Sequence, residues 1–159
     1  MGRIGDLNAV GAAVVEARQR GARVVLTNGA FDMLHVGHLR YLRGAAELGE
    51  LVITAVNSDG SVRGSKGPSR PVIPDHERAE LVAALEMVDW VVVFDEPTVS
   101  GIIEVLKPDV HAKGTDYTAD EVPERAAVEA CGGRVAIVGD PKDHSTTELV
   151  GRLKDLSSE

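Results

Sequence analysis

The chain lacks several features that would place it in a specialised class of protein. Its 159 residues include one cysteine, Cys131, so no internal disulfide can form and a cytoplasmic location is expected. No apolar stretch reaches the roughly 18 residues of a membrane span, and charges interrupt the N-terminal segment where a signal peptide would be apolar. Internal repeats and low-complexity tracts are absent too. We therefore expect a single domain over residues 1–159, with no membrane partner.

Positive charge is also scarce. The chain has 17 Lys and Arg residues against 25 Asp and Glu residues, a formal net charge of −8. Broad binding to nucleic acid or to an anionic membrane needs a basic surface, so neither partner is expected. The same charge does not exclude a single nucleotide, because a few local cations and backbone amides suffice to bind one. Hydrophobic residues make up 43% of the chain, which is typical of a globular protein.

Helical and strand patterns alternate along the chain. Apolar strands that alternate with helices are joined by right-handed crossovers and are buried on both sides. We therefore predict an α/β fold with a Rossmann-like, doubly wound, five-stranded parallel sheet and helices on both faces. The expected helices cover residues 6–20, 38–48, 75–87, 98–106, 119–131 and 145–156, and the expected strands cover residues 24–27, 51–56, 90–94, 110–113 and 134–138.

The most informative segment is residues 27–38, Thr-Asn-Gly-Ala-Phe-Asp-Met-Leu-His-Val-Gly-His. It follows an expected strand and enters an expected helix, where unpaired N–H groups and the helix dipole favour an anion. His35 and His38 are three residues apart and share a helix face, with Gly37 keeping the surface between them low. A zinc site would need further ligands, and no second His/Cys cluster has suitable spacing. The pattern favours phosphate contact, in which imidazole N–H donors stabilise charge that moves to a leaving pyrophosphate.

Three further segments are expected beside this one, because ligands of such sheets bind beyond the carboxyl ends of the strands. They are the loop over residues 57–74, Lys113 with Gly114, and residues 145–147. The loop carries Lys66 and is either a lid over the reacting phosphates or a floppy surface loop. Lys113 is expected to contact a phosphate rather than to be merely exposed. Residues 145–147 either present hydroxyls and amides to a ligand or form an ordinary capping box with Glu148.

Taken together, these motifs resemble a known family. Residues 27–32 followed by His-Val-Gly-His are similar to the nucleotidyltransferase superfamily with the HxGH signature, in its cytidylyltransferase-like branch. Within that branch the chain most resembles the D-glycero-β-D-manno-heptose 1-phosphate adenylyltransferases. The resemblance continues through residues 56–59, 69–72, Arg78, 85–92, 113–117 and 145–147, and so covers nearly the whole chain in order.

The resemblance implies a reaction. An oxygen of a sugar 1-phosphate attacks the α-phosphorus of ATP in line, giving ADP-heptose and pyrophosphate, with Mg²⁺ bound largely by the phosphates of the nucleotide. The implied catalytic residues are His35, His38, Lys113 and Arg78, and the implied nucleotide-binding residues are Asn28, Gly29, Ala30, Phe31, Asp32, Gly37, Lys66, Ser145, Thr146 and Thr147.

Several of these roles have competing interpretations. Arg78 is a candidate for binding the triphosphate or the incoming phosphate, or it is a solvated helix cation. Asp32 binds magnesium, binds a ribose hydroxyl, or braces its loop. Asp116 and Tyr117 shape the sugar pocket, although turn formation explains Asp116 equally well.

Three positions depart from the heptose branch. His111 stands where an aliphatic residue is usual, Thr115 replaces a frequent glycine, and His144 precedes the Ser-Thr-Thr block. These departures leave open a cytidylyltransferase that uses CTP and glycerol 3-phosphate or a related phosphate. A nucleotide-binding module without catalysis is a third hypothesis. Similar enzymes imply a homodimer, and a separate sugar kinase is expected upstream, because this activity is often fused to one.

Overall fold

A parallel sheet of six strands organises the part of the chain that the computed structural model describes, residues 1–141 and 144–157. The strands follow the order β1-β4-β3-β2-β5-β6, and each pairing is parallel. The order reverses between β2 and β5, so this is the topological switch point of the sheet. The strands are β1 (Arg3–Ile4), β2 (Val24–Gly29), β3 (Leu51–Asn57), β4 (Trp90–Phe94), β5 (Val110–Lys113) and β6 (Arg134–Ile137).

The prediction of five strands was one short. The additional strand, β1, pairs Arg3 with Trp90 and Ile4 with Val91 at the edge of the sheet. Both of its residues are exposed, so it has no apolar run. A two-residue edge strand leaves no periodic signal in the sequence. The α/β class and the parallel sheet were predicted correctly.

Helices connect the strands. They are α1 (Leu7–Gln19), α2 (Val36–Ala46), α3 (Asp59–Lys66), α4 (Asp75–Ala83), α5 (Ser100–Leu106), α6 (Arg125–Ala130) and α7 (Thr146–Leu156), with a short 3₁₀ helix over Ala119–Glu121. None of the helices in the described ranges is long and apolar enough to cross a membrane.

The expected helix pattern was wrong in three places. The loop expected over residues 57–74 contains α3, which Ser58 caps by accepting a hydrogen bond from the Ser61 N–H at 3.1 Å. Helix α4 begins at Asp75, as expected, but it ends at Ala83 instead of residue 87. The helix expected over residues 119–131 is interrupted because Val122, which precedes a proline, is extended.

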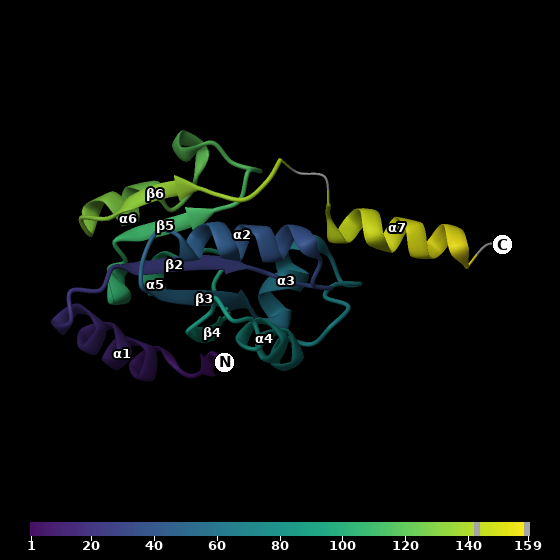
Figure 1. Ribbon diagram of the computed structural model, residues 1–159. Coiled ribbons are helices and arrows are strands. Elements are labelled where there is room, and N and C mark those ends of the chain that lie inside the picture. The colour runs from purple at the N-terminus through teal and green to yellow at the C-terminus, as the bar shows by residue number, and fades with distance from the viewer. Residues whose placement is uncertain (142–143, 158–159) are drawn as a thin grey trace.

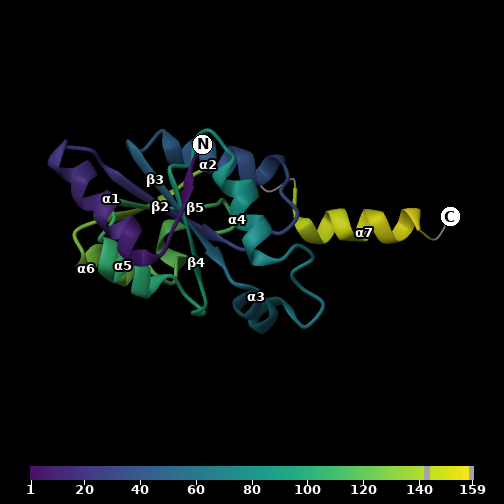
Figure 2. The ribbon, with the colours of Figure 1, turned by 90° about the horizontal axis from the view of Figure 1, so that it is seen from below.

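The core lies on both faces of the sheet. Val24, Leu26 and Ile53 are fully buried in one cluster with side chains of α1, α5 and α6. Val25 and Val52, which point the other way along the same strands, pack with Ala45 of α2. Figure 2 shows α1, α5 and α6 on one side of the strands and α2 with α4 on the other. Helices therefore cover both faces, as predicted.

Helix α7 extends away from the rest of the molecule in both ribbon views (Figures 1 and 2). Its first turn is attached, because the Thr146 hydroxyl donates to the Asp32 carbonyl at 2.6 Å. Farther along, the Leu153 and Leu156 side chains are 54% and 67% exposed. The N-terminus of α7 thus belongs to the globular body, and its apolar stripe is left at the surface.

Candidate active site

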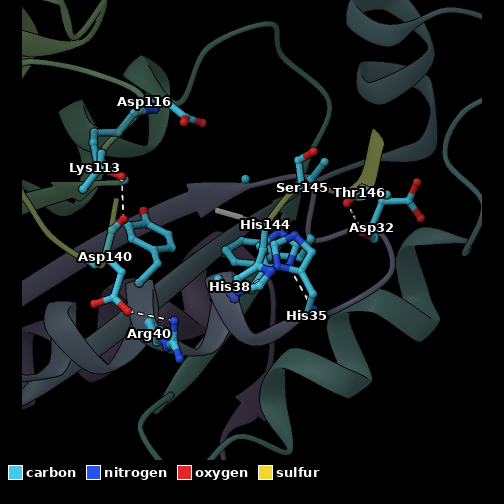
Figure 3. Close-up of a pocket in the computed structure, with 18 of the residues that line it drawn as sticks. Asp32, His35, His38, Arg40, Lys113, Asp116, Asp140, His144, Ser145 and Thr146 are labelled. Carbon is cyan, nitrogen blue, oxygen red and sulfur yellow. Dashed lines mark hydrogen bonds and ion pairs between the residues drawn. The ribbon is translucent and has the colours of Figure 1, made fainter. Parts of the chain in front are cut away.

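A pocket of about 530 Å³ opens at the carboxyl ends of β2 and β5, at the switch point of the sheet. The end of β3, the segment that follows β6 and the start of α7 also contribute to its wall. Every site residue predicted from the sequence lines this pocket, with the exception of Arg78. Figure 3 shows three histidines gathered on one side of it, with Lys113 and Asp116 farther along.

The two signature histidines form the beginning of α2. His35 is the N-cap, and its Nδ1 accepts a hydrogen bond from the Gly37 N–H at 3.1 Å. His38, in the first turn, accepts from the His35 N–H through its own Nδ1 at 3.4 Å. A ring nitrogen that accepts carries no proton, so the single proton of each neutral ring lies on Nε2. Both imidazoles therefore offer an Nε2–H donor at a helix N-terminus.

Burial keeps these rings neutral. It lowers the pKa of His38 to about 4, and the neighbouring His35 and Lys66 act in the same direction. Burial and then His144 also lower the pKa of His35. The two ring centroids lie 3.9 Å apart in a stacked arrangement. Two positively charged rings would repel one another at this distance. At neutral pH the site therefore presents neutral N–H donors rather than imidazolium ions.

Gly37 makes the stacked arrangement possible. A Cβ atom at this position would lie 2.9 Å from the His35 ring, closer than real Cβ contacts. The low surface predicted between the two histidines is therefore a steric requirement.

Asp32 braces the loop that follows β2. Its side chain is 1% exposed, and its oxygens accept from the Val72 and Ile73 N–H groups at 3.0–3.1 Å. Arg70 Nε forms an ion pair with the same carboxylate at 3.1 Å. Of the three interpretations left open by the sequence, the structure supplies contacts for the brace, which joins residues 30–33 to residues 70–73.

Arg78 lies outside the pocket wall, in contrast to the prediction. Its side chain is fully buried and donates to the carbonyls of Ile73, Asn57 and Ala30 and to the Asp59 carboxylate. With these donors engaged, Arg78 is neither a solvated helix cation nor a free phosphate ligand. It ties α4 to the ends of β2 and β3, and so shapes the pocket from behind.

Lys113 reaches the pocket from the end of β5. Its Nζ donates to the Asn28 Oδ1 at 3.2 Å and forms an ion pair with Glu124 at 3.8 Å. The ammonium also lies 4.8 Å from the centroid of the Tyr117 ring. Burial lowers the pKa of Lys113, and the Glu124 carboxylate acts in the opposite direction.

The start of α7, residues 145–147, lines the pocket, where the sequence placed it. Ser145 caps the helix by accepting from the Glu148 N–H at 3.1 Å, whereas the Glu148 carboxylate pairs with Arg152 at 2.9 Å. Half of the expected capping box is therefore present. Thr147 is exposed and, like Ser145, lines the pocket, so capping leaves part of this segment open to a ligand.

Several pocket residues were missed. Arg40 and Asp140 both line the pocket and form an ion pair at 2.8 Å (Figure 3). The buried Tyr41 hydroxyl donates to the Ala112 carbonyl at 2.7 Å, and burial raises its pKa. Tyr41 follows His38 by three residues, so helical spacing could have identified it. No comparable pattern marks residues 138–141, which line the pocket after β6. None marks Glu124 either, which forms the ion pair with Lys113.

No group of three or more His, Cys, Asp or Glu side chains in residues 1–141 and 144–157 is arranged to hold a metal ion. Asp32 already has three partners. The side chains described thus suit a metal that arrives with substrate phosphates better than one held in a protein cage.

Comparison with known proteins gives a consistent result. A model of the cytidylyltransferase-like family matches residues 26–158. The bifunctional protein HldE of Syntrophotalea carbinolica is 49% identical over 138 residues, which are 87% of this chain and 28% of that protein. HldE of Geotalea uraniireducens is 46% identical over 152 residues, which are 96% of this chain and 31% of that protein. The chain therefore spans less than a third of the length of these relatives.

A solved structure extends the comparison to the fold. The crystal structure of the lipopolysaccharide core biosynthesis protein from Thermoplasma volcanium GSS1 superposes with a TM-score of 0.67 at 25% identity. The similarity covers 77% of this chain and 100% of that one. The family resemblance predicted from the sequence is confirmed, and the chain belongs to the cytidylyltransferase-like family.

Proposed function

We propose that this chain is a nucleotidyltransferase that joins D-glycero-β-D-manno-heptose 1-phosphate to the AMP part of ATP, giving ADP-heptose and pyrophosphate. One observation carries the chemistry: two neutral imidazole Nε2–H donors stand at the N-terminus of α2, inside the pocket at the switch point. The motif resemblance supports the heptose, and similarity to HldE proteins and to a lipopolysaccharide core biosynthesis protein agrees with a sugar substrate. Residues 1–159 act as one domain in this proposal.

In the proposed reaction, an oxygen of the sugar phosphate forms a bond to the α-phosphorus as the bond from that phosphorus to the pyrophosphate oxygen breaks. The electron pair of the broken bond leaves with pyrophosphate. His35 and His38 donate from Nε2 to phosphate oxygens whose negative charge increases in the transition state. Amides near Ala30 and Phe31 hold the triphosphate, and Asn28, Gly29 and Gly37 form the surface against which it lies.

The cations of the pocket have a separate task. Attack brings two anions together, and Lys113, with Lys66 at the end of α3, reduces their repulsion. Asp116 and Tyr117 shape the sugar side of the pocket beside Lys113. Ser145, Thr146 and Thr147 border the nucleotide. Arg78 acts only by supporting the loops behind the pocket.

Mg²⁺ accompanies the nucleotide in this proposal. It neutralises charge on the phosphates, which supply most of its ligands. The protein contributes the shape of the pocket, whose wall includes the carboxylates of Asp116 and Asp140.

The molecule also acts with others in this proposal. We expect a homodimer, supported by the exposed Leu153 and Leu156 of α7, because an isolated helix of this length is marginal in water without a packed face. A separate sugar kinase supplies the sugar 1-phosphate, and the reaction takes place in the cytoplasm.

A panel of nucleotides and acceptors tests the assignment. Pyrophosphate release is measured with ATP, CTP, GTP and UTP, each with heptose 1-phosphate and with glycerol 3-phosphate. The expected result is turnover with ATP and heptose 1-phosphate. Turnover only with CTP and glycerol 3-phosphate would overturn the proposed substrates, but the proposed reaction type, nucleotidyl transfer, would stand. Nucleotide binding without turnover in any pair would reject the enzyme in favour of a binding module.

A further inference from the structure

His111 is a buried titratable residue to which the proposed reaction gives no task. It lies in the middle of β5 with no exposed surface, beside Leu26 and Val135 in the sheet register. Its Nε2 lies 3.0 Å from the Asn28 Oδ1, the same oxygen that accepts from Lys113 at 3.2 Å. Two side chains of β5 thus point at one amide oxygen of β2, the neighbouring strand across the switch point.

The chemistry of these groups fixes the orientation of the amide. A lysine ammonium carries donors only, so the Asn28 atom that faces it is the oxygen and not the NH₂ group. Glu124 favours the charged form of this ammonium from 3.8 Å, and both side chains of the ion pair are less than 10% exposed. The amide therefore cannot be reversed without placing N–H groups against a cation.

The proton of His111 follows from this orientation. Because the Asn28 Oδ1 has no hydrogen to give, the His111 Nε2 carries one and donates it. The other nitrogen, Nδ1, is buried and has no partner within residues 1–141 and 144–157. Burial, with Lys113 nearby, lowers the pKa of His111 to about 3, so the ring holds a single proton at neutral pH.

The remaining end of the amide is the NH₂ group of Asn28. No hydrogen bond among the described residues uses it, and Asn28 lines the pocket beside Lys113. Two N–H donors next to an ammonium form a site for an anionic oxygen, because neither group can accept a hydrogen bond.

We propose that His111 is a positioning residue that, together with Lys113, locks the Asn28 amide so that its NH₂ group binds a phosphoryl oxygen of a substrate. The assignment rests on the proposed function for the identity of the substrate, but the tautomer and the amide orientation do not depend on turnover. It explains why a polar ring occupies a buried strand position that would otherwise suit an aliphatic side chain.

Nitrogen-15 NMR of the histidine rings in the full chain tests the proton position without any substrate. The His111 signals are assigned by their loss in His111→Gln. The expected spectrum is the Nε2–H tautomer, unchanged between pH 8 and pH 5. An Nδ1–H tautomer, or titration of this ring in that range, would overturn the proposal.

Inorganic phosphate is the probe for the amide. In the wild-type chain, the Asn28 NH₂ signals are expected to shift in a saturable manner as phosphate is added. In His111→Leu, which loses one of the two donors to Oδ1, the apparent affinity for phosphate should fall about tenfold, in line with one hydrogen bond to a charged group. Signals of the Asn28 NH₂ group that stay fixed while the His38 signals move would overturn the proposal.

Kinetics then separate positioning from general damage. His111→Gln keeps a donor at nearly the same place and should retain most of kcat/KM, whereas His111→Leu should lose about tenfold. Val110→Ala, at the adjacent buried position of β5, is the matched control for destabilisation and should leave kcat/KM unchanged. Equal losses in the Gln and Leu variants would reject the donor role. Absence of turnover by the wild-type chain would reject the proposed function alone, since the NMR results would still stand.

Discussion

His35 and His38 stack with their ring centroids 3.9 Å apart, and each ring accepts a backbone N–H through Nδ1. The helix start is thereby capped by the two side chains that the proposed reaction needs. The same hydrogen bonds that begin α2 also leave Nε2–H on each ring as the available donor. The hydrogen bonds that cap α2 therefore also determine which ring nitrogen can donate to a substrate.

Replacement of His38 by alanine should lower kcat by about 10²–10³-fold, the range observed when one donor to a developing oxyanion is removed. Affinity for ATP should change only a few-fold, because the donor strengthens chiefly in the transition state. The measurements are steady-state kcat and the Kd for ATP. A thermal melt serves as the control, since His38 also accepts from the His35 N–H. Equal losses in kcat and affinity would contradict a catalytic role.

Gly37→Ala should reduce kcat without lowering stability much. The added Cβ would lie 2.9 Å from the His35 ring and displace it, although alanine itself favours a helix by about 0.5–1 kcal/mol. Gly64→Ala in α3 is the matched control, because a Cβ there meets nothing within 4 Å. Steady-state kinetics and thermal melts of both variants check the prediction. Equal kcat in the two variants would show that the stacked geometry does not matter.

Arg78→Met should destabilise the fold by about 3–5 kcal/mol, because removal of the guanidinium leaves carbonyls and the Asp59 carboxylate without their partner. Any folded fraction should keep nearly the wild-type KM for both substrates, since Arg78 does not line the pocket. Urea unfolding and initial-rate kinetics provide the two readouts. Wild-type stability combined with a strongly raised KM would restore Arg78 as a substrate ligand.

The stability of the protein should fall as the pH is lowered below 6.5. The pKa of His38 is about 4 and that of His111 about 3 in the folded chain, against an ordinary value of 6.5. Between those values the unfolded chain binds protons that the folded chain does not, so each ring costs up to about 1.4 kcal/mol per pH unit. Both contributions are absent above pH 6.5.

Urea unfolding at pH 7.5, 6 and 5 measures this dependence. Carboxylates also titrate in this pH range, but they do so in both the wild-type chain and His111→Gln. The difference between the two proteins therefore reports the contribution of the His111 ring alone. The wild-type chain should lose more stability than the variant as the pH falls from 6.5 to 5. A constant difference between the two proteins would contradict the lowered pKa of His111.

The sequence predicted those parts of the fold that leave a periodic signal. The apolar runs of β2, β3 and β4 were recognised because strands buried on both faces are continuous in hydrophobicity. Strand β1 escaped recognition because two exposed residues carry no such run. Helix α3 was hidden by its glycines, and Pro123 divided a helix whose flanking residues read as one.

The pocket was predicted where chemistry and local structure coincide, from Asn28 to His38. Roles set by distant partners could not be predicted in the same way. Arg78 has the sequence context of any helix cation, and its burial depends on the carbonyls of Asn57 and Ala30. No sequence motif includes Glu124, and only the fold brings its carboxylate close to Lys113.

Phosphorus-31 NMR of the wild-type chain with ATP, heptose 1-phosphate and Mg²⁺ tests the central claim most directly. Nucleotidyl transfer predicts that ATP and the sugar phosphate disappear together while pyrophosphate and the signal pair of a new sugar-linked diphosphate appear in equal amounts. The double variant His35→Ala/His38→Ala should leave both substrates unchanged over the same period. Consumption of ATP without the new signal pair, or wild-type rates in the double variant, would contradict the account.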